Sequence, residues 1–293
     1  YTELDGEGRF LIHLYCIRPA VNLRLCLDRG VSSVFFSATL LPVNYYKDLL
    51  TGDMEDYAVY ARSPFDTGKR LLLVGTDVSS RYTRRGEEEY RRMAEYICRT
   101  VQSHKGNYLV FFPSYRMLEE VYGRCLGQTE MLCIRQDSGM DEEERERFLE
   151  RFEEERKESM AAFCVMGGIF SEGIDLTNDR LIGALVIGTG LPQVCREREI
   201  VKDYFDRKGM DGFAYAYQYP GMNKVLQAAG RVIRTDEDQG VILLLDERFQ
   251  SPACQRLFPR EWEQHVNCRI DSLTGYLQDF WDRQERTGSG HQK

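Results

Sequence analysis

The sequence has no apolar run that approaches the roughly 20 residues needed to span a bilayer. Residues 1–9 carry acidic residues and glycines, and they lack the basic flank and apolar core of a signal peptide. These absences exclude a membrane helix and a secretory leader from the sequence as given. They predict a cytoplasmic protein with no membrane partner.

Histidine is scarce, and cysteine lacks the spacing of a metal site. The chain has only 4 histidines, far apart, and its 9 cysteines include no CxxC pair. An odd number of cysteines without such spacing predicts reduced, buried thiols, because disulfide scaffolds and zinc sites use regular patterns. No metal site is expected in this chain.

The chain also lacks the basic excess of a protein that coats duplex DNA. Its 39 Lys and Arg residues against 47 Asp and Glu residues give a net charge of -8. This balance still permits a local groove for a single strand, in which main-chain donors and a few side chains hold the ligand. The 42% of hydrophobic residues excludes wholesale disorder.

Apolar runs of strand length alternate with longer amphipathic segments. Runs such as Tyr108–Phe112 and Val241–Leu245 show no polar alternation, which is typical of strands buried on both faces of a parallel sheet. The pattern predicts an α/β domain with helices on both faces of a mainly parallel sheet. The predicted strands are Phe10–Ile17, Val31–Ser37, Arg70–Gly75, Asn107–Phe112, Met131–Arg135, Ala161–Met166, Leu181–Ile187 and Val241–Leu245. The predicted helices are Glu87–His104, Ser114–Tyr122, Met140–Glu155, Val194–Lys208, Asn223–Ile233 and Leu273–Glu285.

The composition changes across Gly52–Lys69, where glycine, proline and acidic residues replace apolar ones. We interpret this stretch as a linker. The predicted organisation is a short leading piece at residues 1–60, a complete α/β domain at 61–286, and a polar tail at 287–293 that frays.

The segment from Gln227 to Arg234 reads Gln-Ala-Ala-Gly-Arg-Val-Ile-Arg. On a continuous helix, spacings of four and three put Gln227, Arg231 and Arg234 on one face. Two guanidinium groups and an amide beside Gly230 suit a phosphate, and they can stabilise the charge that develops in phosphoryl transfer. The alternative is an ordinary helix whose arginines pair with the acidic residues that follow, Asp236 and Glu237.

The loop after the predicted strand Ala161–Met166 is rich in glycine and carries two carboxylates. Loops at the carboxyl ends of strands are where open α/β sheets bind ligands. Here Gly173 permits close backbone approach, Ser171 can hold a phosphate, and Asp175 can orient a water, a ribose hydroxyl or an arginine. The alternative is a flexible turn.

Two further strands end in hydroxyl residues. Ser37 and Thr39 follow Val34-Phe-Phe, and Ser114 with Tyr115 follows Tyr108–Phe112. A hydroxyl and an aromatic ring at a helix N-terminus can hold a nucleic-acid phosphate and stack a base. A simple helix cap explains both pairs equally well.

Taken together, Ser-Ala-Thr, Phe-Phe-Pro-Ser-Tyr, Ser-Glu-Gly-Ile-Asp and Gln-x-x-Gly-Arg-x-x-Arg resemble motifs III to VI of superfamily 2 helicases. The Ser-Glu-Gly-Ile-Asp form and the long insert before the last motif are similar to the XPD/DinG branch. The resemblance covers roughly residues 31–249. It implies a second RecA-like motor domain of the P-loop NTPase type, with the trailing edge of the first.

The resemblance implies an ATP-driven DNA helicase that moves 5′ to 3′ on a single strand, with ATP bound between two motor lobes. Arg231 and Arg234 would meet the γ-phosphate, with Gln227 as a third catalytic residue. The other roles that it implies are nucleotide binding or sensing for Gly173, Asp175 and Gly230, DNA binding for Ser114, Tyr115, Ser171 and Glu172, and coupling between lobes for Ser37 and Thr39.

The sequence departs from a complete helicase in two motifs. It contains no GxxxxGK[ST] loop and no DExH box, so the residues that grip Mg²⁺ and the triphosphate are missing. Together with the start at Tyr1, this predicts the C-terminal half of a longer helicase that does not hydrolyse ATP alone. ATP and Mg²⁺ would act in the full-length protein, where the N-terminal motor lobe and single-stranded DNA are the expected partners. An iron–sulfur cluster would belong only to that N-terminal half.

Two other interpretations stay open at this point. One is a non-catalytic RecA-like module that binds single-stranded DNA or protein partners. The other is a nucleotide-dependent enzyme that uses Gly188-Thr-Gly190, a short motif that lacks the third glycine of a dinucleotide site. In the basic and aromatic insert Leu191–Met222, most tyrosines are expected in the core, and Tyr217 or Tyr219 are the better candidates for stacking on a base.

Overall fold

The structure, a computed structural model, describes residues 1–128, 130–168, 170 and 180–289. The chain divides into two compact units. We call Tyr1–Tyr60 with Pro192–Pro220 the smaller unit, and Ala61–Leu191 with Gly221–Lys293 the larger unit. The segment 192–220 therefore groups with the leading piece, whereas the sequence placed it inside the second domain.

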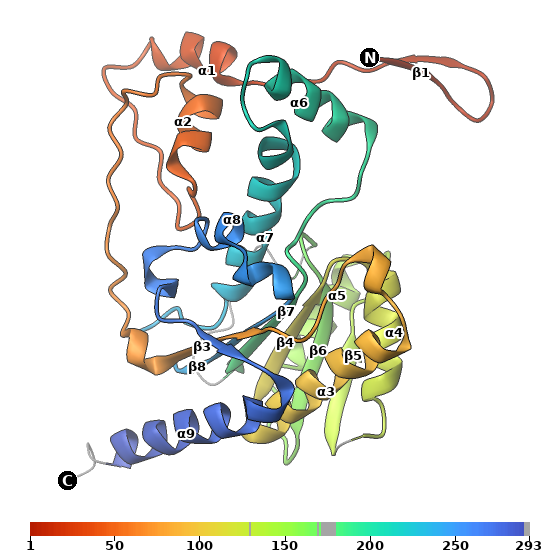
Figure 1. The fold of residues 1–293 in the computed structure, drawn as a ribbon, viewed down its shortest axis with the longest axis vertical. Helices are drawn as coiled ribbons and strands as arrows, with labels where there is room; N and C mark the ends of the chain where they lie inside the picture. The colour runs from red at the N-terminus through yellow and green to blue at the C-terminus, as the bar shows by residue number, and fades with distance from the viewer. Residues whose placement is uncertain (129, 169, 171–179, 290–293) are drawn as a thin grey trace. The chain divides into compact units, whose positions relative to one another are not determined.

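A parallel sheet forms the centre of the larger unit (Figure 1). Within the described residues, seven strands lie in the order β5-β6-β4-β7-β8-β3-β9, and each neighbouring pair is parallel. The strands are β3 (Arg70–Gly75), β4 (Asn107–Phe112), β5 (Met131–Arg135), β6 (Ser159–Val165), β7 (Gly183–Ile187), β8 (Gly240–Leu245) and β9 (Val266–Cys268).

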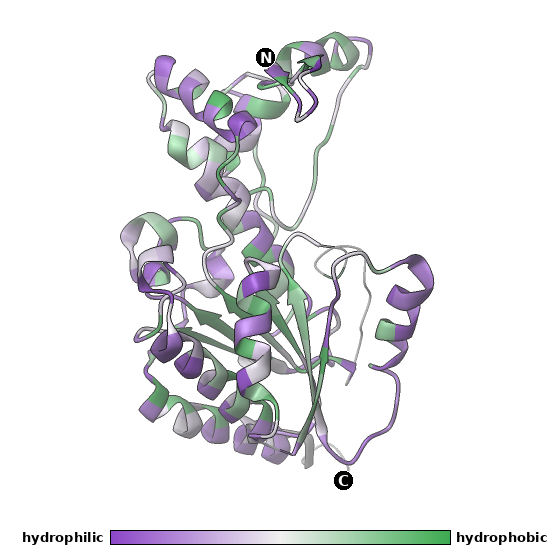
Figure 2. Cartoon of the chain, turned by 90° about the vertical axis from the view of Figure 1, so that its right-hand side faces the viewer, coloured by the Kyte–Doolittle hydropathy of each residue, from purple (hydrophilic) through white to green (hydrophobic). Residues whose placement is uncertain are grey.

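Both faces of this sheet are buried, which explains why its strands are continuous apolar runs. Val110 and Phe112 of β4 belong to the same core cluster as residues of α3, α4 and α9. Phe111, which points to the opposite face, is also fully buried. Figure 2 shows the strands in apolar colours and the outer helix faces in polar ones. The prediction of an α/β fold with a mainly parallel sheet is confirmed.

Side-chain caps mark the start of helices in the larger unit, and α5 gives the clearest example. The side chain of Asp141 accepts a hydrogen bond from the N–H of Glu144 at 2.8 Å, and the side chain of Glu144 accepts one from the N–H of Asp141 at 3.0 Å. This capping box starts α5. The helices are α3 (Glu87–Ser103), α4 (Tyr115–Cys125), α5 (Glu142–Glu150), α7 (Tyr219–Ala229, which begins in the last two residues of the smaller unit), α8 (Pro252–Gln255) and α9 (Ile270–Ser289).

The smaller unit is mainly helical. Its strands β1 (Thr2–Leu4) and β2 (Phe10–Ile12) form an antiparallel pair. Its other elements are α1 (Ala20–Leu27), α2 (Val43–Leu50), α6 (Arg196–Arg207) and a π-helix at Ala214–Gln218.

Several predictions differ from the structure. The predicted strand Phe10–Ile17 is shorter, at Phe10–Ile12, and the predicted helix Met140–Glu155 is shorter, at Glu142–Glu150. The strand Val31–Ser37 is wrong, because this segment is irregular and pairs with no strand among the described residues; the side chains of Val34 and Phe36 are 82% and 90% exposed. The helix Asn223–Ile233 is too long at its end, because α7 stops at Ala229 before Gly230. Of the tail predicted at residues 287–293, residues 287–289 are the last residues of α9.

Candidate functional site

The carboxyl ends of the strands bring together polar residues from loops far apart in the sequence. Ser80 follows β3, Asp246 follows β8, and Gly188 follows β7. A Cβ added to Gly188 would lie 2.6 Å from the Ser80 hydroxyl, so these two loops touch. This edge of an open α/β sheet is where ligands bind.

A buried carboxylate paired with a half-buried arginine links the loops at this edge. Asp246 is fully buried and accepts hydrogen bonds from the N–H and hydroxyl of Ser80, at 2.9 and 2.7 Å. The guanidinium of Arg248 contacts both carboxylate oxygens of Asp246 at 2.8 Å. Burial acts to raise the pKa of Asp246, but Arg248 and Ser80 outweigh it, and the pKa lies below its usual range. Because the carboxylate is fully engaged, we regard this group as a structural brace.

A second charged group lies beside it at the start of α3. The buried carboxylate of Glu89 accepts the N–H of Ser79 at 2.9 Å and pairs with Arg84. Arg84 also contacts Glu247 at 2.8 Å. These bonds fix the loop after β3 against the loop after β8.

Ser114 and Tyr115 lie where β4 leads into α4, and both are partly exposed. The hydroxyl of Ser114 caps α4 by accepting the N–H of Met117 at 3.4 Å. The cap that the sequence offered as an alternative is therefore present.

A buried glutamine that the sequence did not single out positions Tyr115. The side-chain amide of Gln136 donates to the Tyr115 hydroxyl at 3.0 Å, and its oxygen accepts the N–H of Val165 at 3.0 Å. A Cβ on Gly168 would lie 3.4 Å from the same amide. Gln136 thus links the ends of β4 and β6 at the sheet edge. A polar residue directly after a predicted strand was the signal that could have identified it.

The arginine segment lies at the other end of the sheet. Because α7 ends at Ala229, Arg231 and Arg234 follow the helix, and the predicted single helical face is wrong. Val232 packs against Gly240, the first residue of β8, and Lys69, just before β3, donates to the carbonyl of Asp236 at 2.5 Å. The length of β8 therefore separates this segment from the carboxyl edge, roughly 17 Å for six residues.

The arginine segment has a defined conformation. Buried Asp238 accepts hydrogen bonds from the N–H groups of Arg234 and Thr235, both at 2.7 Å. Val232 is buried, whereas Arg231 and Arg234 are partly exposed. The segment thus fixes its backbone through Asp238 and buries the side chain of Val232.

The remaining predicted site residues lie outside the described residues or belong to the smaller unit. Ser171, Glu172, Gly173 and Asp175 lie outside the described residues. Ser37 and Thr39 belong to the smaller unit, where their hydroxyls lie 3.3 Å apart on an exposed segment. Tyr217 is buried and donates its hydroxyl to Glu199, so it is not available for stacking on a base.

The described residues contain no cluster of three or more His, Cys, Asp or Glu side chains that could hold a metal ion. In the same part of the chain, no helix has both the length and the apolar character needed to cross a bilayer.

The helicase C-terminal domain family matches residues 97–265, more than half of the chain. The chain belongs to this family. Its relatives include a probable ATP-dependent helicase of Methanocaldococcus jannaschii, 26% identical over 85% of this chain and 41% of that protein. The ATP-dependent DNA helicase XPD of Sulfolobus acidocaldarius is 25% identical over 92% of this chain and 48% of that protein.

Among solved structures, one titled XPD_APO matches with a TM-score of 0.68 and 22% identity, covering 86% of this chain and 51% of that one. A second, titled XPD_Helicase, has a TM-score of 0.67 and 21% identity, with 86% and 45% covered. The resemblance to XPD-type helicases predicted from the motifs is confirmed. The chain spans about half the length of the relatives that it matches, or less.

Proposed function

We propose that this chain of the helicase C-terminal domain family is the second motor lobe of an ATP-dependent 5′–3′ DNA helicase. The observation that carries the proposal is the placement of Arg231 and Arg234. They leave α7 on a segment anchored by Asp238, and both are partly exposed. From there they can act as arginine fingers on the γ-phosphate of ATP held by an N-terminal lobe. Gln227 would complete this group, and Gly230 lets the chain leave the helix.

The opposite edge of the sheet suits the DNA strand. Tyr115 offers a partly exposed aromatic ring whose hydroxyl is fixed by Gln136, and Ser114 offers the start of a helix. Stacking on such rings binds single strands without sequence preference. Ser171 and Glu172 would extend this path, and Gly173 and Asp175 would connect it to the nucleotide.

An N-terminal motor lobe is the partner we propose for the smaller unit. Val31, Val34 and Phe36 are each more than four-fifths exposed, an unusual state for large apolar residues so close together in one segment. Pairing with a sheet in the missing lobe would bury them, and Ser37 and Thr39 would then link the lobes. The relatives are long enough to contain such a lobe.

The residues of this chain suit the phosphate groups of ATP but do not provide a binding site for the whole ATP–Mg²⁺ complex. The guanidinium groups of Arg231 and Arg234 suit phosphate oxygens, but the sequence has no P-loop and the described residues hold no acidic metal cluster. We therefore assign triphosphate and Mg²⁺ binding, and any iron–sulfur cluster, to the N-terminal half. A cytoplasmic location stays a prediction.

The missing P-loop also favours a second candidate, a RecA-like module that binds single-stranded DNA or proteins without turnover. An experiment on the full-length protein separates the two. Arg231→Ala and Arg234→Ala should each lower DNA-stimulated ATP hydrolysis by about 10³-fold or more, with the fold intact. Arg286→Ala, at an exposed position of α9, is the matched control. Near-normal turnover in both variants, or a wild-type protein without ATPase activity, would contradict the motor-lobe proposal.

A further inference from the structure

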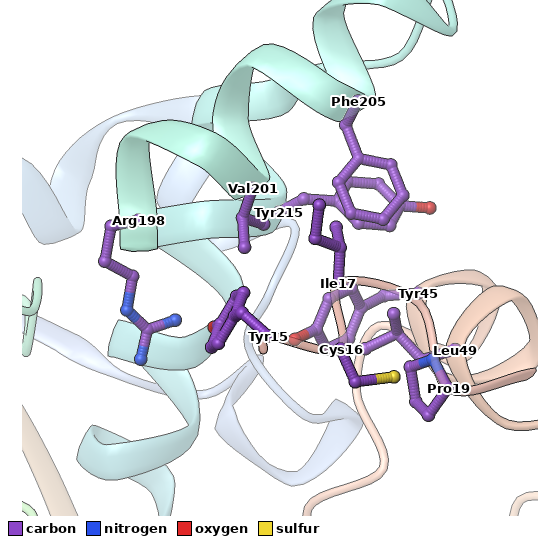
Figure 3. Close-up of a pocket in the computed structure, with 10 residues that line it drawn as sticks. All are labelled: Tyr15, Cys16, Ile17, Pro19, Tyr45, Leu49, Arg198, Val201, Phe205 and Tyr215. Carbon is purple, nitrogen blue, oxygen red and sulfur yellow. The ribbon is translucent and has the colours of Figure 1, made fainter. Parts of the chain in front are cut away.

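The smaller unit contains a cavity of about 210 Å³ lined largely by aromatic residues (Figure 3). Its walls come from the segment before α1, from α2, from α6 and from the π-helix. Drug-sized ligands occupy pockets of roughly 300–1,000 Å³, so this cavity suits a smaller group. The lining residues are Tyr15, Cys16, Ile17, Pro19, Tyr45, Leu49, Arg198, Val201, Phe205 and Tyr215.

The aromatic wall is held rigidly. The rings of Phe205 and Tyr215 lie 4.0 Å apart at 30°, and Tyr45 meets Tyr215 edge-on at 5.2 Å. Arg18, next to two lining residues, pairs with buried Asp48 on α2 at 2.6 Å and neutralises it. The wall therefore needs little reorganisation to accept a planar ring, which favours binding.

Several polar groups at the cavity are not used by the protein. In the described part of the chain, the hydroxyls of Tyr45 and Tyr215 make no hydrogen bond, although burial raises the pKa of each to about 12 and keeps both protonated. These two hydroxyls can therefore hydrogen-bond a ligand that carries donors and acceptors on its edge.

The guanidinium group of Arg198 places a positive charge in the wall of the cavity. Arg198 donates one hydrogen bond to the carbonyl of Ala216 at 3.2 Å, and within the described residues it pairs with no carboxylate. Figure 3 shows its guanidinium extending toward Tyr15, whose side chain is 44% exposed. An arginine with free donors beside aromatic rings is suited to a phosphate attached to a planar group.

From these features we propose that the cavity binds one unpaired nucleotide of a nucleic-acid strand. The base stacks against the ring of Tyr15 or Tyr45, its edge meets the Tyr45 hydroxyl, and its phosphate lies on Arg198. The proposal rests on the proposed DNA-binding function and adds a subsite in the smaller unit, distinct from Ser114 and Tyr115 in the larger one.

The test uses the 293-residue chain and a fluorescein-labelled oligomer of 20 thymidines, with affinity measured by anisotropy at fixed salt. Arg198→Gln and Tyr15→Ala should each weaken binding about tenfold, within the range found for a stacked base, and Tyr45→Phe about threefold. Arg207→Gln is the matched control, because this residue lies on the same helix but does not line the cavity. Tyr15 is at the exposed rim, so its truncation leaves the fold intact, which a thermal melt checks.

Photocrosslinking locates the strand. An oligomer carrying 5-iodouracil should attach to peptides containing Tyr15, Tyr45 or Tyr215. Unchanged affinity in Arg198→Gln and Tyr15→Ala, with adducts confined to the peptide of Tyr115, would overturn this inference and leave the proposed function standing. A wild-type chain that binds no oligomer would contradict both. Free thymidine monophosphate that competes at concentrations below the oligomer Kd would show a mononucleotide site, and would overturn the assignment to a strand.

Discussion

Gln136 donates its side-chain amide to the hydroxyl of Tyr115 at 3.0 Å while its oxygen accepts the N–H of Val165. One buried side chain thereby satisfies a backbone group of β6 and orients the residue that begins α4. The two contacts can be separated by mutation, because one uses the amide nitrogen and the other uses the oxygen.

We expect Gln136→Leu to lower the free energy of unfolding by about 1–3 kcal/mol, since the N–H of Val165 loses its acceptor in a buried place. Gln136→Glu keeps an acceptor there and should cost less. Urea denaturation of both variants, each with and without Tyr115→Phe, measures the coupling between Gln136 and Tyr115. Equal losses in the Leu and Glu variants would show that the contact with Val165 does not matter.

We expect Asp246 to make the free energy of unfolding depend on pH in the acid range. Its pKa in the folded chain is below the value of about 3.9 in an unfolded one. Folding therefore favours the ionised form, so the stability that it contributes is present above about pH 4 and is lost as pH falls through the folded pKa. Asp246→Asn should be less stable at pH 7, because Arg248 loses its buried, charged partner. Its free energy of unfolding should also fall less than that of the wild type as the pH is lowered (a flatter acid limb).

Denaturation curves at several pH values between about 2 and 7 check this prediction. Asp279→Asn, at an exposed position of α9, is the control and should follow the wild-type profile. An acid limb in Asp246→Asn as steep as that of the wild type would assign the pH dependence to other carboxylates.

Gly190 should tolerate no side chain. Its φ is +68°, and an added Cβ would lie 2.2 Å from the carbonyl oxygen of Gly221. Gly127 has a similar φ of +74° but open space around it, so Gly127→Ala bears only backbone strain of about 1–2 kcal/mol. Gly190→Ala should be destabilised by about 1–3 kcal/mol more, because the backbone must also shift. Similar urea midpoints for the two variants would rule out the close approach.

The isolated chain should not hydrolyse ATP. No P-loop is present to grip the β-phosphate and Mg²⁺, so arginines alone have no bound triphosphate to act on. Phosphate release is measured with and without Mg²⁺ for the wild type and for Arg231→Ala, purified side by side. Mg²⁺-dependent turnover that disappears in Arg231→Ala would contradict the prediction, whereas equal traces in both proteins indicate a contaminant.

The sequence predicts the larger unit well because its strands are buried on both faces and therefore apolar throughout. It fails at Val31–Ser37, where the pattern of a strand is present but no partner strand pairs with it in the described residues. It also fails beyond Ala229, because periodicity says which residues could share a face but not that Gly230 ends the helix.

The candidate site shows the same limit. Hydroxyl, glycine and arginine motifs are visible as local patterns, so Ser114, Tyr115 and Arg231 could be proposed from the sequence. For Gln136 the sequence shows only a polar residue after a predicted strand, and its contact with Tyr115, 21 residues away, is not visible there. The same holds for the hydrogen bond from Arg248 to Ser80, 168 residues away. Contacts of that range depend on the order of strands in the sheet, which no local pattern contains.

The smaller unit is built from two separate segments of the chain, and this restricts where the protein can be truncated. Its segments Tyr1–Tyr60 and Pro192–Pro220 are separated by most of the larger unit in sequence, yet they supply opposite walls of one aromatic cluster. A truncation that starts at residue 61 would retain Tyr215 and Phe205 but remove Tyr45 and Asp48. The remaining helices would expose apolar rings to water, so such a shortened protein should aggregate unless residues 192–220 are excised with it.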